Sequence, residues 1–255
     1  MTYSYTQISQ YLSCPRRYRH RYLDGWQERD TRAAMLFGRS FEKALAAFFR
    51  HEDPASSLFE QWAPCKDLGL TYSANDTWDR MLQQGIQLLE RFAQDGRVRI
   101  GPRSNQQIQF NRTLSSGNDF VSYVDAIGEL DGTPCVLEWK TTSARYPEEP
   151  VGISALDPQL VCYSWMTGID EVAQIVFVRK RLVEVQYLRA TITEEQRQEF
   201  ATLVDDTVRR IGSGLFLPHS GIRFPQKSLH HLPLHRALSR QARLGRSRPC
   251  AQTRS

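Results

Sequence analysis

The sequence predicts a mixed α/β fold in which helices flank a β-sheet, and three observations support this class. Apolar residues recur at helical spacing through about the first hundred residues. After Gly101-Pro102 the spacing changes to alternation, and beyond residue 157 helical and alternating stretches follow one another. Such an order places helices against the faces of a sheet. A chain of 255 residues with 40% hydrophobic positions can build this core, which argues against collagen-like, coiled-coil and largely disordered proteins.

The first hundred residues are expected to be helical. Residues 5–23 alternate aromatic and basic side chains, and Pro15 suits the first turn of a helix, so we expect two short helices that break near Ser13. Helical spacing predicts a long amphipathic helix over residues 33–50 and another over residues 75–95. The connector between those helices contains two prolines and predicts no regular element.

Five strands are expected after Pro102. The turn pair Asp131-Gly132 joins the second strand to the third. A helix is expected at residues 158–167, with Asp157 as its cap and Pro158 in its first position. A last helix begins in TEEQRQEF and reaches about residue 211. The strands are expected at residues 106–114, 120–130, 134–141, 173–180 and 183–190.

Residues 219–255 differ from the rest of the chain because they contain eight basic residues and neither Asp nor Glu. The chain as a whole carries +5, whereas the stretch before this tail has 25 basic against 28 acidic residues, a net charge of −3. Such a tail can follow a phosphate backbone, or it can be a solvated terminus. We expect one domain over residues 1–218, with a helical region over residues 1–100 and a catalytic core over residues 101–218, followed by a disordered basic tail.

Targeting signals are not evident in the sequence. The longest apolar runs fall short of the roughly 18 residues of a membrane helix, and MTYSYTQISQ lacks the order of a signal peptide. Five scattered cysteines fit a reducing compartment better than a disulfide framework. We therefore expect a cytoplasmic protein with no membrane partner.

Charged side chains gather on two of the predicted strands. Glu138 and Lys140 lie two residues apart on one strand and so share a face, and the preceding hairpin can bring Asp125 beside them. Two carboxylates form a hard-oxygen site that suits Mg²⁺ or Mn²⁺. A lysine there can position the attacking water and neutralise phosphate charge. The Glu-x-Lys triplet alone also occurs on ordinary surface hairpins, so its context decides.

That context resembles a known family. Asp125 followed by Glu138-Trp139-Lys140 is similar to the active-site hairpin of the PD-(D/E)XK nuclease superfamily, most of all its RecB-like/Cas4-like branch. Gln159 and Tyr163, four residues apart on one helix face, match the QxxxY motif of that branch. The stretch SQYLSCPRRYRHRYL resembles its CPxxY signature, and the likeness covers about residues 3–225. It implies a restriction-endonuclease-like fold and metal-dependent hydrolysis of DNA.

The resemblance also implies a role for each site residue. Asp125 and Glu138 would hold Mg²⁺ or Mn²⁺ together with the carbonyl of Trp139, and Lys140 would orient the attacking water. Many relatives carry a histidine ligand in the first long helix, where this chain has Glu42. Glu42 would supply another oxygen ligand, unless it is a helix glutamate that pairs with a nearby arginine. In these relatives Gln159 and Tyr163 contact DNA or hold the active-site strands.

The amino-terminal signature carries two further expectations. Arg16, Arg17 and Tyr18 could contact DNA, or they could belong to a packed helix whose arginines face solvent. Cys14 matches the first ligand of a 4Fe-4S cluster in many relatives, but the late CxxCxxxxxC trio is absent, so we expect no cluster. One permitted choice of codons for residues 227–239, read one base later, encodes that missing spacing. A frameshift is therefore one hypothesis for the basic tail, and the nucleotide sequence tests it.

Two functions follow. The first is a metal-dependent DNA nuclease, of exonuclease type, that acts on single strands or duplex ends in repair, recombination or defence. The second is a non-catalytic DNA-binding scaffold or subunit of a helicase–nuclease complex. The sequence has no GxxxxGK[ST] phosphate loop, so a helicase motor would have to be a separate partner.

Overall fold

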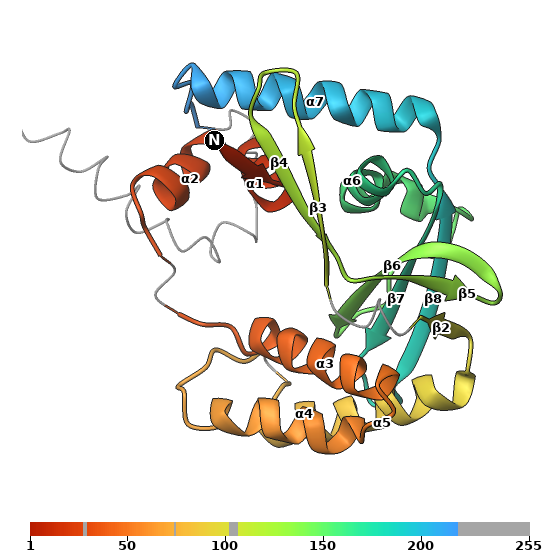
Figure 1. Cartoon of the computed structure of the whole chain (residues 1–255). Helices are drawn as coiled ribbons and strands as arrows, with labels where there is room; N and C mark the ends of the chain where they lie inside the picture. The colour runs from red at the N-terminus through yellow and green to blue at the C-terminus, as the bar shows by residue number, and fades with distance from the viewer. Residues whose placement is uncertain (28–29, 74, 102–106, 219–255) are drawn as a thin grey trace, which may run out of the picture.

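The computed structural model describes residues 1–27, 30–73, 75–101 and 107–218, and the mixed α/β class is confirmed (Figure 1). No helix within these ranges is long and apolar enough to cross a membrane. The predicted tail, residues 219–255, lies outside them. The helices are, in chain order, α1 (Tyr5–Ser13), α2 (Pro15–Tyr18), the π-helix η1 (Arg19–Leu23), α3 (Ala33–Phe49), α4 (Pro54–Trp62), the 3₁₀-helix η2 (Ala63–Cys65), α5 (Trp78–Asp95), the 3₁₀-helix η3 (Ile153–Leu156), α6 (Pro158–Thr167) and α7 (Glu194–Gly212).

The strands form two sheets rather than the single one expected. The smaller sheet has the order β1-β4-β3 and the larger one β2-β5-β6-β7-β8, in which β6 and β7 are parallel. The predicted strand over residues 120–130 is broken at Asp125, where the chain leaves one sheet and enters the other. The strands are β1 (Thr2–Ser4), β2 (Val98–Ile100), β3 (Ile108–Thr113), β4 (Asp119–Val124), β5 (Ala126–Leu130), β6 (Thr133–Thr142), β7 (Glu171–Val178) and β8 (Glu184–Thr191).

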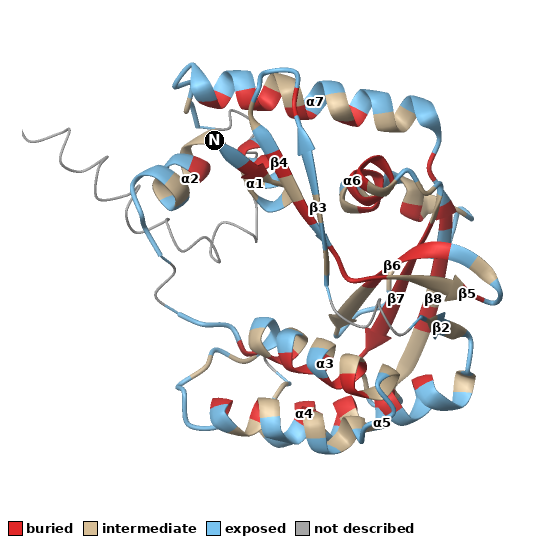
Figure 2. Ribbon diagram, in the orientation of Figure 1, coloured by how far each residue is buried: buried red, intermediate tan, exposed pale blue. Residues whose placement is uncertain are grey.

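Two hydrophobic cores lie on opposite sides of the larger sheet. The first core joins α1, α6, α7 and the smaller sheet, and the second joins α3, α4 and α5 to the other face (Figure 2). Strand β6 serves both, because side chains in a strand alternate: Val136 enters the first core and Leu137 the second. The next two residues of β6 that share the face of Val136 are Glu138 and Lys140. Polar site residues therefore extend from the edge of the first core.

The elements that the sequence did not reveal are short or lie in the connector. Strands β1 and β2 have three residues each, too few for a period to be visible. Helix α4 lies in the proline-containing connector, where Pro54 occupies the first turn and the carboxylate of Asp53 accepts hydrogen bonds from the backbone N–H of Ala55 and of Ser56. This part of the connector is helical because the cap and the proline of the first turn both favour a helix, although its mixed composition hides the helical spacing of apolar residues.

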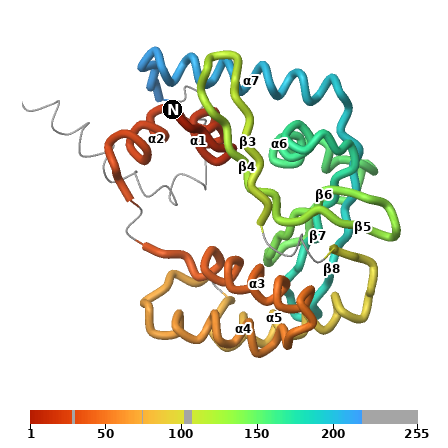
Figure 3. Tube along the Cα trace, viewed as in Figure 1, coloured from red at the N-terminus to blue at the C-terminus, as the bar shows by residue number. Residues whose placement is uncertain are grey.

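The end of the described chain packs on the amino-terminal helices (Figure 3). The hydroxyl of Tyr11 donates to the carbonyl oxygen of Leu215 at 2.6 Å, and the rings of Tyr18 and Phe216 stack with centroids 6.1 Å apart. Residues far apart in sequence thus close the first core on the side of α1.

Strand β5 depends on Gly128. A Cβ atom at this position would lie 2.3 Å from the backbone oxygen of Arg99 on β2, which is closer than any stable contact. We expect Gly128→Ala to lower the free energy of unfolding by about 1–3 kcal/mol, because β2 must shift. Urea denaturation measures this change. Gly212→Ala, whose Cβ meets open space at the end of α7, is the matched control and should stay within about 0.5 kcal/mol. Equal stability of the two variants would contradict the close approach.

Candidate active site

The candidate site lies where β6 passes between the β4–β5 junction and α6. Glu138 and Lys140 extend from β6, and Asp125 occupies the junction itself. Helix α6 begins at Pro158 after the predicted cap Asp157, whose Oδ1 accepts a hydrogen bond from the backbone N–H of Gln159 at 2.8 Å. The predicted bounds of this helix are confirmed. Its first turn therefore holds Gln159 close to β6.

A continuous hydrogen-bond network joins β6 to α6. Lys140 Nζ donates to Glu138 Oε1 and, at 2.8 Å, to Gln159 Oε1. Gln159 Nε2 in turn donates to Glu138 Oε1 at 2.8 Å and to the hydroxyl oxygen of Tyr163 at 2.7 Å. One amide thus satisfies the lysine and the glutamate at the same time. The structure brings together four of the residues that the sequence singled out.

Asp125 faces the same network from the other strand. Its Oδ2 accepts a hydrogen bond from the backbone N–H of Trp139 at 2.9 Å, and the residue is only 9% exposed. Burial raises the pKa of Asp125 well above its usual range, and the negative charge of Glu138 and a hydrogen bond to it raise this pKa further. Two carboxyl groups are therefore held close together in a poorly hydrated place.

Glu42 on α3 lies within the field of this pair. Burial raises the pKa of Glu42, and so does the charge of Glu138, whereas Lys140 and Arg39 oppose the shift. The sequence leaves open that Glu42 pairs with a nearby arginine, and Arg39 on the same helix is an arginine whose charge acts on Glu42. Within the ranges that the structure describes, no three His, Cys, Asp or Glu side chains converge closely enough to form a metal-binding group. Glu42 therefore stands near Asp125 and Glu138 without completing a set of three.

The donor atoms of the pair nevertheless fit a hard divalent cation. Glu138 Oε2 is buried and has no hydrogen-bond partner, although a buried carboxylate oxygen is costly to leave unsatisfied. Asp125 adds a second carboxylate, and carboxylate oxygens are the ligands that Mg²⁺ and Mn²⁺ prefer. The chemistry of these two groups thus suits the metal that the resemblance implies.

Trp139 contributes to the site through its backbone. Its N–H binds Asp125, while its indole ring packs on the opposite side of the sheet in the second core. The ring centroid lies 6.0 Å from that of Phe49 on α3 and 6.1 Å from that of Phe92 on α5. This packing fixes the β6 backbone between Glu138 and Lys140.

Two residues at the site escaped prediction from the sequence. Gln174 on β7 is the register neighbour of Glu138, is 2% exposed, and donates from Nε2 to Asp157 Oδ2 at 2.6 Å. Its signal was a lone amide inside the apolar strand EVAQIVFV. Tyr5, the first residue of α1, is the other: burial and the charge of Asp157 raise its pKa to about 12, whereas Lys140 lowers it. The amino-terminal helix thus borders the site.

The residues of the CPxxY signature lie apart from this network. Tyr18 is only 3% exposed and packs against Tyr11 and Phe216, which favours the packed-helix alternative over a DNA contact for this residue. Arg16 and Arg17 are partly exposed beside it.

Cys14 follows the last residue of α1 and is partly exposed. Among the described residues the other cysteines, Cys65, Cys135 and Cys162, are buried, the first two of them in the second core. A 4Fe-4S cluster needs four thiolates in one place, whereas the buried cysteines are divided between cores on opposite sides of the larger sheet, so the described residues do not fit one. Cys250 lies outside them.

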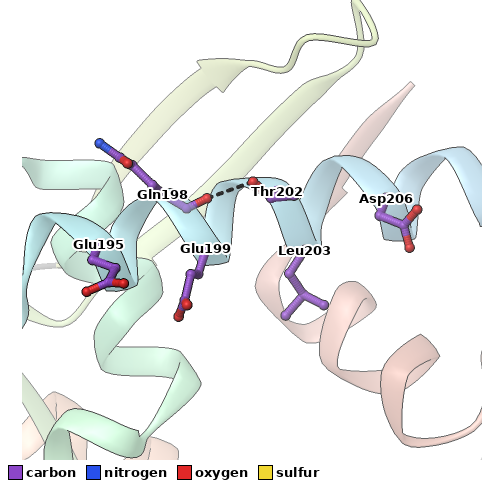
Figure 4. Close-up of a pocket in the computed structure, with 6 residues that line it drawn as sticks. All are labelled: Glu195, Gln198, Glu199, Thr202, Leu203 and Asp206. Carbon is purple, nitrogen blue, oxygen red and sulfur yellow. Dashed lines mark hydrogen bonds between the residues drawn. The ribbon is translucent and has the colours of Figure 1, made fainter.

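Two hollows on the described surface lie away from this network. Figure 4 shows one along the outward side of α7, lined by Glu195, Glu199, Leu203 and Asp206 among others. Its acidic lining does not suit a phosphate backbone. A second hollow lies between α5 and the β7–β8 turn, lined in part by Glu90, Arg91 and Arg181. Neither includes Asp125, Glu138 or Lys140, so the candidate site rests on its side-chain network.

Two carboxylates and an ammonium group in one place form a site that can hold a divalent cation beside a phosphate. The sequence pattern of the PD-(D/E)XK nuclease superfamily matches residues 2–223. The chain belongs to the PD-(D/E)XK nuclease superfamily, which confirms the broader resemblance.

A solved structure supports this fold. A structure from Eubacterium rectale, described as that of a candidate exonuclease, aligns with a TM-score of 0.54 and 12% identity over 99% of this chain and 90% of that chain. LHK-Exo in complex with dAMP aligns with a TM-score of 0.34 and 13% identity over 82% of this chain and 98% of that chain. No matching relative is found among curated proteins.

Proposed function

We propose that this protein is a Mg²⁺- or Mn²⁺-dependent DNA nuclease of the RecB-like branch, with exonuclease-type activity. The observation that carries the proposal is the network of Lys140, Glu138, Gln159 and Tyr163 beside Asp125, in a chain of the PD-(D/E)XK superfamily. Residues 1–218 would make up the nuclease domain. The likeness to that branch extends the proposal to DNA repair, recombination or defence, to a cytoplasmic location, and to a helicase subunit as partner.

The proposed roles follow from the contacts. Asp125 and Glu138 would hold the metal, with Glu42 and the carbonyl of Trp139 as further oxygen donors. When bound, the metal would supply charge stabilisation for the phosphate and lower the pKa of a water molecule. Positioning of the water and of the carboxylates is left to the side chains of the network.

Lys140 would orient the attacking water and neutralise phosphate charge. Burial disfavours its ammonium group, but the charge of Glu138 and the hydrogen bond to it outweigh this, so the pKa of Lys140 is raised and the group stays protonated. With its side chain 26% exposed, Nζ can be reached from solvent. Gln159 and Tyr163 would keep Nζ and the Glu138 carboxylate in a fixed relation, so that the hydrolysis is a positioned displacement.

A cleavage assay tests the function. The full-length protein is incubated with end-labelled single-stranded and blunt duplex DNA in Mg²⁺, in Mn²⁺ or in EDTA. We expect the labelled strand to be shortened from its end only when metal is present, with mononucleotides among the products. No metal-dependent cleavage, with DNA binding retained, would contradict the proposal and favour the scaffold function.

The pair Gln174 and Asp157 is expected to position Gln159. Gln174→Ala removes the 2.6 Å hydrogen bond to Asp157, whose carboxylate holds the backbone N–H of Gln159. We expect kcat for DNA cleavage to fall roughly 10- to 100-fold, as is usual when a supporting residue is lost, with a smaller change in KM. Steady-state kinetics at saturating metal measure this split.

The matched control is Gln186→Ala. Gln186 is a buried glutamine on the neighbouring strand β8, but its bonds go to Tyr146 and Glu148 rather than to the network. If both variants lose kcat equally, Gln174 has no special positioning role.

A further inference from the structure

An exposed aromatic pair lies on the chain that connects α2 to α3. The indole ring of Trp26 stacks on the imidazole of His20 with centroids 4.5 Å apart and an interplanar angle of 18°. Trp26 is 43% exposed and belongs to none of the hydrophobic cores, whereas the His20 side chain beneath it is 12% exposed. One face of the indole therefore covers the histidine while the ring stays open to solvent.

Local hydrogen bonds hold this pair in place. The backbone N–H of Trp26 donates to the carbonyl oxygen of His20 at 2.8 Å, and His20 Nδ1 lies 2.9 Å from Asp24 Oδ2. Gly25 between them has a φ of 71°, a left-handed conformation that lets the chain turn back on η1. Because the ring is already ordered, a ligand that stacks on it loses little affinity to ordering the loop.

The chain that leads to the pair is positively charged. Residues 14–23 contain four arginines and no acidic residue, and Arg19 and Arg21 are exposed in the turn that precedes Trp26. Asp24, which lies within the turn between His20 and Trp26, is already engaged by His20 and by Arg19, 3.5 Å away. A rigid aromatic surface beside arginines is what single-stranded nucleic acid requires, since its bases stack on aromatic rings while its phosphates attract cations. A duplex hides its base faces and cannot use such a ring.

The position of the pair relates it to the candidate site. Figure 1 shows the described chain leaving α2 along one side of the molecule, and residues 30–32 entering α3 from that same side. Helix α1, before this connection, begins with Tyr5, whose pKa responds to Lys140, and helix α3, after it, carries Glu42. The connection thus joins two elements that border the site.

We propose that the Trp26–His20 pair, flanked by Arg19 and Arg21, is a stacking platform for single-stranded DNA. This inference rests on the proposed nuclease function and adds to it the form of the substrate and a place where the strand is held. Base stacking on Trp26 gives the preference for single strands, and the arginines give a contact to phosphate that does not depend on sequence.

The test measures binding without cleavage. In a Lys140→Ala background with EDTA, fluorescence anisotropy gives the Kd for a labelled oligo(dT) of roughly 20 nucleotides, longer than the usual site size, and for a blunt duplex of equal length. We expect Trp26→Ala to weaken oligo(dT) binding roughly 10- to 100-fold, duplex binding to change much less, and Trp26→Phe, which keeps a stacking ring, to stay within about threefold. Circular dichroism verifies that each variant is folded.

The control is Phe59→Ala on α4, because Phe59 is also exposed but lies away from the arginine cluster. Wild-type affinity in Trp26→Ala, an equal loss in Phe59→Ala, or an equal loss for duplex would each overturn the platform. An oligo(U) arm of the same length shows whether RNA competes, and tighter binding of oligo(U) than of oligo(dT) would overturn the assignment to DNA.

The platform and the nuclease can fail separately. If the wild-type protein cuts DNA but Trp26→Ala binds normally, only the platform is wrong. If no cleavage is found while Trp26→Ala still loses single-strand binding, the platform stands and the nuclease function does not.

Discussion

Lys140→Ala is expected to lower kcat for metal-dependent DNA cleavage by roughly 10²- to 10³-fold, the usual effect of removing one preorganised donor from an active site. Lys140 is the cation of the network, bonded to Glu138 and to Gln159. Without it the phosphate charge has no ammonium group beside it, and the water loses a donor. KM should change less than kcat, because the lysine is proposed to act in the transition state rather than in binding.

A second variant separates charge from hydrogen bonding. Removing Lys140 leaves Glu138 buried without its cation, so alanine also costs stability. Lys140→Gln retains a hydrogen-bond donor but has no charge. We expect it to be more stable than Lys140→Ala and equally inactive. Single-turnover rates and thermal unfolding of both variants give the two readouts.

The control is Lys180→Ala in the turn between β7 and β8. Lys180 pairs with Glu184, outside the site, so its loss should leave kcat within about twofold of the wild type, as is usual for a surface ion pair. Cleavage by Lys140→Ala at the wild-type rate would remove Lys140 from the proposed mechanism.

Local pattern revealed most of the larger elements but not the position of Asp125. Alternation over residues 120–130 predicts one strand, and the period has no means of marking a point where two sheets meet. In the structure Val124 packs in the first core and Ala126 in the second. The break leaves Asp125 between them, where its carboxylate can bind the backbone N–H of Trp139. The position of Asp125 thus depends on a contact with a distant part of the chain, which the local alternation of apolar residues cannot reveal.

The same limit explains Gln174 and Tyr18. A glutamine inside an apolar strand has no meaning until the register sets it beside Glu138. For Tyr18 the sequence leaves open a DNA contact or a packed helix face, and only the packing of Leu215–Phe216, about two hundred residues later, on that side of the helices favours the second. The QxxxY pair was predictable, because four residues on a helix fix a common face whatever the tertiary context.

Function and stability oppose each other at the carboxylates. Burial and the proximity of Glu138 and Glu42 raise the pKa of Asp125, so the charged form that would bind a metal is the form that the fold disfavours. Functional sites often hold such a cost, which a bound cation offsets. The folded protein without metal should therefore lose stability as Asp125 ionises.

Asp125→Asn is expected to remove cleavage and yet to stabilise the metal-free protein by roughly 0.5–2 kcal/mol at neutral pH. The amide keeps an oxygen for the backbone N–H of Trp139 and carries no charge. Because the folded-state pKa of Asp125 lies above the unfolded value, the native state binds more protons, and the unfolding free energy of the wild type falls as pH rises through that folded pKa. The advantage of the asparagine variant should grow over the same interval.

Thermal unfolding in EDTA across acidic to neutral pH measures this advantage, and added Mg²⁺ should stabilise the wild type more than the variant. Asp131→Asn should change stability in the opposite direction. A hydrogen bond and the charge of Arg97 lower the pKa of Asp131, so the loss of this carboxylate should destabilise the protein at pH values above the usual pKa of an aspartate. If Asp125→Asn unfolds at a lower temperature than the wild type without metal at neutral pH, the repulsion between the carboxylates is not what limits the stability of the site. If Asp125→Asn unfolds at a higher temperature than the wild type and is not stabilised by Mg²⁺, then the Asp125 charge that burial disfavours is the charge that binds the cation.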